Sequence, residues 1–380
     1  MTWRIPLFDL NFGKEEESAI IEVLKSKWIS MGDKTKEFEQ RFAELLGVKH
    51  AIAVTNCTAA LHMAMVVLGI GPEDEVIVPS FTFVATVNAV KYVGATPVFA
   101  DITSLEDLTI SPSDIRKKIT NRTKAIVVMH YGGFACDMDE IMKIASENNL
   151  FVIEDAAHSP LATYKNKSLG TFGDISAFSF FSNKNITTAE GGMFVTNNDE
   201  YAKKARLIRS HGMTTMSFDR FKGHATKYDV VELGYNYRLD NIRSAIGLAQ
   251  LKKLTADVSK RLELVQAYHQ RLSQLDSIII PFIGKETSSS NYIFPIVLKK
   301  ECKISRDDFR GALASYGIQT SVHYPAVHEF SIYSDESVKL PITEYVTRNE
   351  VTLPLYYSMT RNDVNYVCDA IEKILEGNKI

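Results

Sequence analysis

The chain has 380 residues, of which 45% are hydrophobic and 23% are charged, the composition of an ordinary folded protein. Its 43 lysine and arginine residues nearly balance 46 aspartate and glutamate residues, so the net charge of -3 indicates neither a nucleic-acid nor an anionic-membrane partner. No stretch approaches the roughly 18 uncharged apolar residues of a membrane helix, which excludes a membrane-spanning protein, and the apolar content excludes a disordered one.

The first residues run into an acidic cluster at 15–17 and contain no apolar signal-peptide core, which predicts a cytoplasmic protein. From residue 51 to 195, short β-rich runs alternate with helix-period segments, as a mostly parallel sheet with crossover helices requires. The seven expected strands are 51–54, 75–78, 97–99, 125–129, 151–153, 175–179 and 193–196. The expected helices between them are 58–68, 82–93, 113–119 and 138–148.

A long helical pattern at 241–275 follows, and its length suggests a connector between two domains. Beyond it, the sequence predicts a smaller α+β domain with strands at 278–280, 292–298 and 318–322 and a helix at 305–316. We therefore expect a large domain at 1–250 and a small C-terminal domain at 251–380. The four cysteines form no Cys-x-x-Cys pair, so we expect buried thiols, no disulfide framework and no metal.

A candidate phosphate site follows the first strand. The sequence contains no Gly-x-Gly-x-x-Gly and no P-loop, so a dinucleotide site and a P-loop nucleotide site are both excluded. Residues 55–62 instead place small and polar residues at the start of a helix, where free N–H groups and the helix dipole can hold a phosphate. The alternative is that Thr58 is an ordinary helix N-cap.

Two further segments contain residues typical of an active site. The apolar strand at 151–153 leads to Asp155 at its carboxyl end, where a buried carboxylate needs a cationic partner unless it only caps a helix. An aromatic strand at 175–181 leads to Lys184 and then to a Gly-Gly pair at 191–192. A lysine among aromatic side chains is desolvated and can serve as a Schiff-base nucleophile, whereas a surface lysine at a turn would have no such role.

These three features occur in the order and spacing of a fold-type-I pyridoxal phosphate enzyme. The chain resembles the DegT/DnrJ/StrS nucleotide-sugar aminotransferases, a branch of the aspartate aminotransferase superfamily. The resemblance runs from about residue 5 to 374, and three segments carry it most specifically: Pro-Ser-Phe-Thr-Phe-Val-Ala-Thr at 79–86, Val-Ile-Glu-Asp-Ala-Ala-His at 152–158 and Lys-Asn-Ile-Thr-Thr-Ala-Glu-Gly-Gly at 184–192. It implies an α/β fold with a large seven-stranded domain and a smaller α+β domain.

The resemblance also implies a role for individual residues. Lys184 would bind pyridoxal phosphate covalently and move the proton between the amine-bearing carbon and the cofactor, which passes through a pyridoxamine phosphate form. Asp155 would pair with the pyridinium nitrogen, and His158 would lie beside the phenolic oxygen. The remaining cofactor contacts implied are Phe83 on the ring face, and Thr58, the backbone N–H of Ala59, and Ser179 on the phosphate.

Other implied contacts come from a second subunit and from the small domain. Asn236 and Arg238, in Gly-Tyr-Asn-Tyr-Arg at 234–238, would reach across a homodimer interface, Asn236 to the cofactor phosphate and Arg238 to the substrate. His323, Tyr324 and His328 match a family segment near the sugar or amino-donor site. The alternative for this segment is a Tyr-Pro turn with aromatic packing.

The retained lysine favours transamination, because a related branch that removes a hydroxyl carries histidine there. The sequence around Lys184 is similar to that of family members that aminate C4 of UDP-linked 4-keto sugars, although Phe181 and Ser182 stand where those enzymes have His-Ala. We expect L-glutamate to donate the amine and a UDP-linked 4-keto-6-deoxyhexose to accept it, giving an amino sugar for lipopolysaccharide or another glycan. The alternatives are C3 amination, a dTDP- or GDP-linked sugar, and a catalytically silent cofactor-binding regulator.

Overall fold

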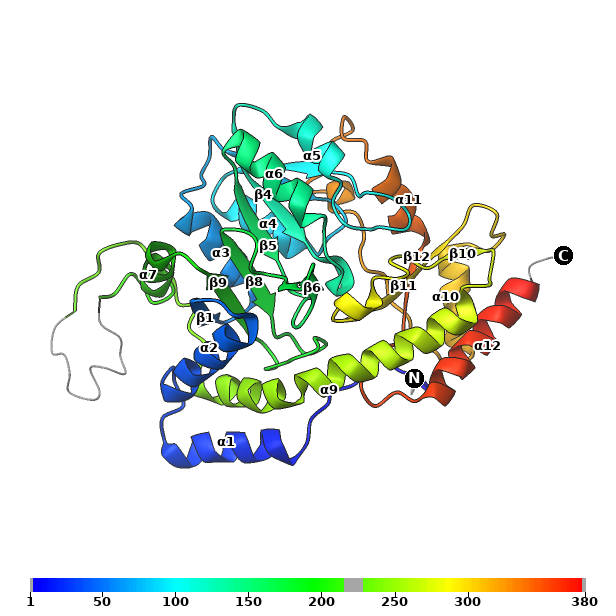
Figure 1. The fold of residues 1–380 in the computed structure, drawn as a ribbon, viewed down its shortest axis with the longest axis horizontal. Helices are drawn as coiled ribbons and strands as arrows, with labels where there is room; N and C mark the ends of the chain where they lie inside the picture. The colour runs from blue at the N-terminus through cyan, green and yellow to red at the C-terminus, as the bar shows by residue number, and fades with distance from the viewer. Residues whose placement is uncertain (1–2, 215–227, 378–380) are drawn as a thin grey trace.

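The structure, a computed structural model, describes residues 3–214 and 228–377 (Figure 1). Its centre is a seven-stranded sheet with the order β1-β9-β8-β5-β4-β2-β3, in which β9 runs antiparallel to both of its neighbours and the other pairs are parallel. The strands are β1 (His50–Val54), β2 (Glu75–Pro79), β3 (Thr96–Ala100), β4 (Thr123–Met129), β5 (Phe151–Asp155), β8 (Ile175–Ser179) and β9 (Gly192–Thr196). The expected mostly parallel seven-stranded sheet is confirmed.

Successive side chains of each strand point to opposite faces of this sheet, and both faces are buried. In β4, Ala125 and Val127 join one apolar core, and Ile126 and Val128 join another. Helices α3 (Cys57–Val67), α4 (Val84–Tyr92) and α7 (Asp199–Ile208) cover the first face, and α5 (Pro112–Lys118) and α6 (Met138–Asn148) cover part of the second. This double burial explains the near-continuous apolar runs in the sequence.

The C-terminal part contains a second, three-stranded antiparallel sheet with the order β10-β11-β12. Its strands are β10 (Ile278–Ile279), β11 (Phe294–Leu298) and β12 (Glu350–Leu353), and its helices are α10 (Arg306–Ser315), α11 (Pro341–Asn349) and α12 (Arg361–Gly377). The expected strand at 318–322 is wrong. Ile318 and Ser321 each form only an isolated bridge, to Ile5 and Thr352 respectively, because two different segments supply their backbone partners.

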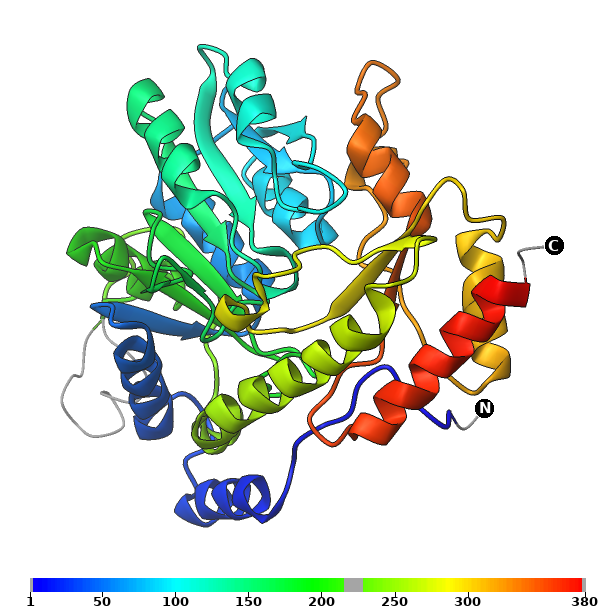
Figure 2. The ribbon, with the colours of Figure 1, turned by 45° about the vertical axis from the view of Figure 1, so that its right-hand side comes forward.

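A 32-residue helix, α9 (Asn241–Leu272), runs from beneath the central sheet to the small sheet (Figure 2). Helices α1 (Lys14–Ser26) and α2 (Asp33–Leu46) pack on its first half, and α12 packs on its second half. The short elements are a hairpin of β6 (Thr163–Tyr164) and β7 (Lys167–Ser168) and single turns η1 (Tyr131–Gly133), η2 (Glu286–Ser288) and η3 (Val327–Glu329). None of the helices in the described ranges has the length and apolar character to cross a membrane.

The N-terminal segment lies against the C-terminal part of the chain. The backbone N–H groups of Arg4 and Ile5 both donate to the carbonyl of Gly317, and Leu355 N–H donates to the carbonyl of Leu7. The side chain of Ile5 is buried in the core of the small sheet. The division into domains at residue 250 stays a prediction, and α9 crosses that position without interruption.

Candidate active site

The first wall of the site is the turn between β1 and α3. Asn56 is the N-cap of α3, and its side-chain oxygen accepts a hydrogen bond of 2.8 Å from Ala59 N–H. Thr58 is therefore not the cap and lies in the first turn of the helix. Strand β9 approaches this turn closely, since a Cβ at Gly192 would lie 2.4 Å from the carbonyl carbon of Asn56. The Gly-Gly pair thus permits close packing under the start of α3.

The second wall is the carboxyl end of β5, where Asp155 is buried. One carboxylate oxygen accepts a 2.6 Å hydrogen bond from the Thr86 hydroxyl, and the other accepts one of 3.1 Å from Ala157 N–H. No helix begins here, because the chain turns toward β6, so Asp155 is not a helix cap. Burial raises the pKa of Asp155, and the hydrogen bonds and the nearby Lys184 ammonium oppose that rise.

Lys184 lies on the turn between β8 and β9, half-buried rather than exposed. Its Nζ atom is 4.2 Å from the ring centroid of Tyr292, a distance at which a cation is attracted to an aromatic face. The turn is tied to the C-terminal part of the chain, because the Asn185 amide donates a 2.7 Å hydrogen bond to the carbonyl of Ser290. Lys184 is therefore held between the large sheet and the segment that leads into β11.

His158 is the centre of an aromatic stack. Its ring lies parallel to Tyr292 at a centroid distance of 4.3 Å, and its Nδ1 accepts a 3.2 Å hydrogen bond from Gly132 N–H. Nε2 must then carry the proton and donate to the Tyr324 hydroxyl, 3.0 Å away. Burial, together with the charge of Lys184, holds the pKa of His158 well below its usual range, so the ring is neutral. The Tyr324 O–H remains available as a donor.

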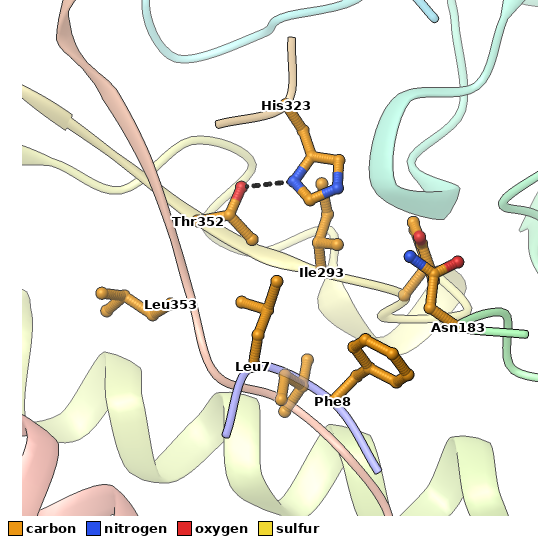
Figure 3. Close-up of a pocket in the computed structure, with 9 residues that line it drawn as sticks. Leu7, Phe8, Asn183, Ile293, His323, Thr352 and Leu353 are labelled. Atoms are coloured by element: carbon orange, nitrogen blue, oxygen red, sulfur yellow. Dashed lines mark hydrogen bonds between the residues drawn. The ribbon is translucent and has the colours of Figure 1, made fainter. Parts of the chain in front are cut away.

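His323 completes the site from the small domain. Its Nδ1 lies 2.9 Å from the hydroxyl of Thr352 on β12, and burial lowers the pKa of its ring to about 3. Figure 3 shows this hydrogen bond, with the second ring nitrogen on the side facing Asn183. A cavity of about 20 Å³ lies between these residues and the N-terminal Leu7 and Phe8, which is room for about one water molecule.

Most of the residues expected from the sequence line a single cavity of about 410 Å³. They are Thr58, Phe83, Asp155, His158, Ser179, Lys184, His323 and Tyr324. Phe83 is 56% exposed and lies at the rim, with its ring centroid 5.9 Å from that of Tyr324. The sequence therefore predicted residues from five separate segments that the fold brings together. The described ranges contain no cluster of three or more His, Cys, Asp or Glu side chains that could hold a metal.

Four expected residues lie elsewhere. The N–H of Ala59 donates to Asn56, as described above, and Asn236 is exposed on a segment that bridges to Ser210. Arg238 is half-buried, and burial followed by the charge of Arg209 lowers its pKa. His328 is buried away from the cavity lining, where its Nδ1 lies 2.6 Å from the Ser80 hydroxyl. The predicted cofactor contact of Asn236 and substrate contacts of Arg238 and His328 stay predictions.

Several lining or supporting residues were missed. Tyr292 and Asn183 line the cavity, and Thr86 holds Asp155 from α4. Thr86 lies in the first turn of α4, four residues after Thr82, and their hydroxyls are 2.9 Å apart. Two hydroxyl residues at this spacing after a strand could have indicated the site from the sequence. No sequence pattern marks Tyr292 as a site residue, because only the tertiary packing of the small sheet brings it to Lys184.

The chain is similar in sequence and in fold to known aminotransferases. Residues 11–372 match the model of the DegT/DnrJ/EryC1/StrS aminotransferase family. Among curated proteins, GDP-perosamine synthase of Escherichia coli O157:H7 is 39% identical over 372 residues, covering 97% of this chain and 98% of its own.

Two solved structures show the same fold over nearly their whole length. Helicobacter pylori PseC, an aminotransferase involved in the biosynthesis of pseudoaminic acid, is 31% identical with a TM-score of 0.90, covering 99% of this chain and 100% of its own. Streptococcus pneumoniae Spr1654, a sugar aminotransferase solved in its pyridoxal phosphate form, is 26% identical with a TM-score of 0.90, covering 100% of both chains. Spr1654 is also known in a pyridoxamine phosphate form.

Proposed function

Since the chain belongs to the DegT/DnrJ/EryC1/StrS aminotransferase family, we propose that it moves the amino group of L-glutamate to the keto carbon of a nucleotide-activated sugar. The proposed acceptor is a UDP-linked 4-keto-6-deoxyhexose. The observation that carries this proposal is that Lys184 and Asp155 line one cavity of about 410 Å³. An amine nucleophile and a buried acid in one enclosed space are the two groups that pyridoxal phosphate chemistry requires.

The residues present fit the family's cofactor, pyridoxal phosphate. Burial raises the pKa of Asp155, so a cationic ring nitrogen beside it would stabilise the ionised carboxylate. The hydroxyls of Thr58 and Ser179, with the start of α3, supply donors for a phosphate in the same cavity. When bound, the cofactor supplies an aldehyde that links to an amine and a ring that takes up the electrons of a broken C–H bond.

The protein's own residues then have distinct tasks. With the cofactor present, Lys184 Nζ would hold its aldehyde group and would carry the proton that moves during transamination. Thr86 and Ala157 keep the Asp155 carboxylate oriented. His158, neutral and fixed by Gly132, directs the Tyr324 hydroxyl so that its O–H donates into the cavity. Burial also raises the pKa of Tyr324 well above its usual range, so this hydroxyl stays protonated.

A homodimer is part of the proposal. Asn236 and Arg238 lie outside the cavity lining of their own chain, on a segment that also exposes Val231 (56%) and Leu233 (82%). Exposed apolar side chains on one segment favour a surface that another protein covers. We propose that a second copy covers this segment and that Asn236 and Arg238 serve the partner's site.

A GDP-linked acceptor is the second candidate, because GDP-perosamine synthase is 39% identical over nearly the whole chain. The test is a panel of UDP-, dTDP- and GDP-linked 4-keto-6-deoxyhexoses with glutamate, in which 2-oxoglutarate formation is followed and the products are weighed by mass spectrometry. We expect the UDP sugar to give the highest kcat/KM. A higher value with the GDP sugar would select the second candidate, and no turnover with any sugar would indicate a regulator.

Borohydride reduction of the cofactor-loaded protein tests the assignment of Lys184. We expect the cofactor to be fixed to the peptide that contains Lys184, and Lys184→Ala to lower turnover at least roughly 10² to 10⁴-fold, as for a lost general acid-base. Lys165→Ala is the matched control, since that lysine is exposed and pairs with Asp139. Label on the peptide of Lys165 or Lys167 would contradict the assignment.

A further inference from the structure

Beside His323, and outside the lining of the large cavity, lies a carboxyl group that the proposed chemistry does not use. Glu350, the first residue of β12, is fully buried. Its Oε2 accepts a 2.8 Å hydrogen bond from the backbone N–H of His323, and its Oε1 lies 2.5 Å from the hydroxyl of Thr352. The same hydroxyl is 2.9 Å from His323 Nδ1. Glu350, Thr352 and the His323 ring therefore form one continuous chain of hydrogen bonds.

A hydroxyl has one proton to donate, so this chain has two self-consistent arrangements. When Glu350 is ionised, the Thr352 hydroxyl donates its hydrogen bond to the carboxylate. The Thr352 oxygen must then accept a hydrogen bond from His323 Nδ1, so Nδ1 carries the proton of the ring. When Glu350 is neutral, its acidic proton lies on Oε1, because Oε2 already accepts from the backbone. Thr352 then accepts from Glu350 and donates to Nδ1, which requires the proton of His323 on Nε2.

We propose that Glu350 is a positioning residue that acts through Thr352 to select which tautomer of His323 faces the active-site cavity. Nε2 is the ring nitrogen on the side facing Asn183, and Asn183 and His323 line both the large and the small cavity (Figure 3). A neutral Glu350 makes Nε2–H a donor toward a bound oxygen, and an ionised Glu350 makes Nε2 an acceptor. This inference rests on the proposed function for its catalytic meaning, since that function places the substrates in this cavity.

The charges around Glu350 allow both states near neutral pH. Burial raises the pKa of Glu350 to about 8, while its hydrogen bonds and the positive charges of Arg306 and Arg310 on α10 oppose that rise. The other titratable groups that face it are Tyr131, Tyr324 and the His323 ring. Both tyrosines have pKa values well above their usual range and stay neutral, so neither changes charge in the same interval.

The test is nuclear magnetic resonance of the holoenzyme with isotopically labelled histidine ring nitrogens, because a bare and a protonated nitrogen resonate far apart. His323→Gln identifies the His323 signals among the nine histidines. We expect the proton on Nε2 at about pH 6.5 and on Nδ1 at about pH 9.5, with a midpoint near the Glu350 pKa of about 8.

Three variants separate a relay from a merely structural role. Glu350→Gln should keep the proton on Nε2 at every pH, since its amide oxygen accepts from the backbone and its NH₂ group donates to Thr352. Thr352→Val, which keeps the shape, should abolish the pH response and lower kcat about tenfold, and Thr352→Ser should restore both. The wild-type pH profile of kcat should contain a step near pH 8, which Glu350→Gln removes.

The same spectra can overturn the proposal. A His323 ring that keeps one tautomer from about pH 6.5 to about pH 9.5 in the wild-type enzyme would contradict it, as would an unchanged pH response in Thr352→Val. The wild-type measurement does not depend on any variant folding. If the tautomer change occurs but no sugar is aminated, the relay stands and the proposed function fails.

Discussion

Asp155 is a buried acid that accepts hydrogen bonds from the Thr86 hydroxyl and from Ala157 N–H. We expect Asp155→Asn to preserve this local shape but to lower kcat by roughly a hundredfold or more, because the charge that stabilises a cationic ring is lost. Cofactor affinity, measured by absorbance titration, should fall less than kcat.

Asp174→Asn is the matched control for this substitution. Asp174 is also a carboxylate whose pKa is raised by burial, but it lies just before β8, at the opposite end of the sheet, and accepts from Val152 N–H. Its replacement should leave turnover close to that of the wild type. Near wild-type turnover in Asp155→Asn would contradict this role of the charge and would indicate that Asp155 only orients the turn.

The buried Glu350 makes the stability of the protein depend on pH. Its folded-state pKa of about 8 exceeds the usual value of 4.5, so between these values the folded protein holds a proton that the unfolded chain releases. Stability from this group is therefore present below about pH 4.5 and is lost as the pH rises through about 8. We expect the Tm of Glu350→Gln relative to the wild type to rise by roughly 5 °C from about pH 5 to about pH 9.

The exposed Glu336→Gln removes the same charge at the surface and serves as the control. Its Tm difference from the wild type should stay constant over the same interval. A constant difference for Glu350→Gln as well would show that Glu350 ionises as readily in the folded protein as in the unfolded chain.

At the scale of elements, two helix glycines should respond in opposite directions to alanine. A Cβ at Gly247 in α9 would lie 2.6 Å from the ring of Phe38, which is fully buried in α2, so Gly247→Ala should destabilise the protein by about 1 to 3 kcal/mol. Gly311 in α10 is exposed with no atom within 4 Å of the added Cβ. Gly311→Ala should therefore stabilise by up to about 1 kcal/mol.

Urea unfolding of both variants measures this difference. If Gly247→Ala were as stable as Gly311→Ala, helices α2 and α9 would have to separate without cost. That result would contradict the close packing through which α9 supports the large sheet.

Strands of the large sheet were predictable because burial on both faces gives apolar runs of strand length between turn residues. The small sheet was harder. Strand β12 contains two polar residues, Glu350 and Thr352. Their side chains belong to the chain of hydrogen bonds that ends at the His323 ring and do not pack in an apolar core. The segment at 318–322 has a β-rich composition, yet its backbone partners come from Ile5 and Thr352, which no local pattern reveals.

The candidate site divides in the same way. Asp155 and Lys184 follow strands of the large sheet, where the position of a residue at a strand end already indicates the ligand side. Tyr292 has no such marker, since its place depends on how the small sheet packs against the turn of Lys184. Sequence reasoning thus found the residues fixed by topology and missed those fixed by packing.

At the scale of the whole molecule, the location of Asn236 makes a prediction about assembly. Lys184→Ala and Asn236→Ala should each be inactive as homodimers but should complement one another when mixed, because one site then carries both lesions and the other carries neither. Recovered activity should approach half of the wild-type value per heterodimer. No recovery after verified subunit exchange would assign Asn236 to its own chain.

The docking of the N-terminal segment constrains when the protein can become complete during its synthesis. Ile5 needs the backbone of Gly317 and Gln319, and the carbonyl of Leu7 accepts from Leu355 N–H, so this segment cannot dock before residues 317–355 have been synthesised. Leu7 and Phe8 also close the small cavity beside His323. The nascent chain can thus build the large sheet early, but this wall of the pocket forms only after residues 317–355 have been synthesised.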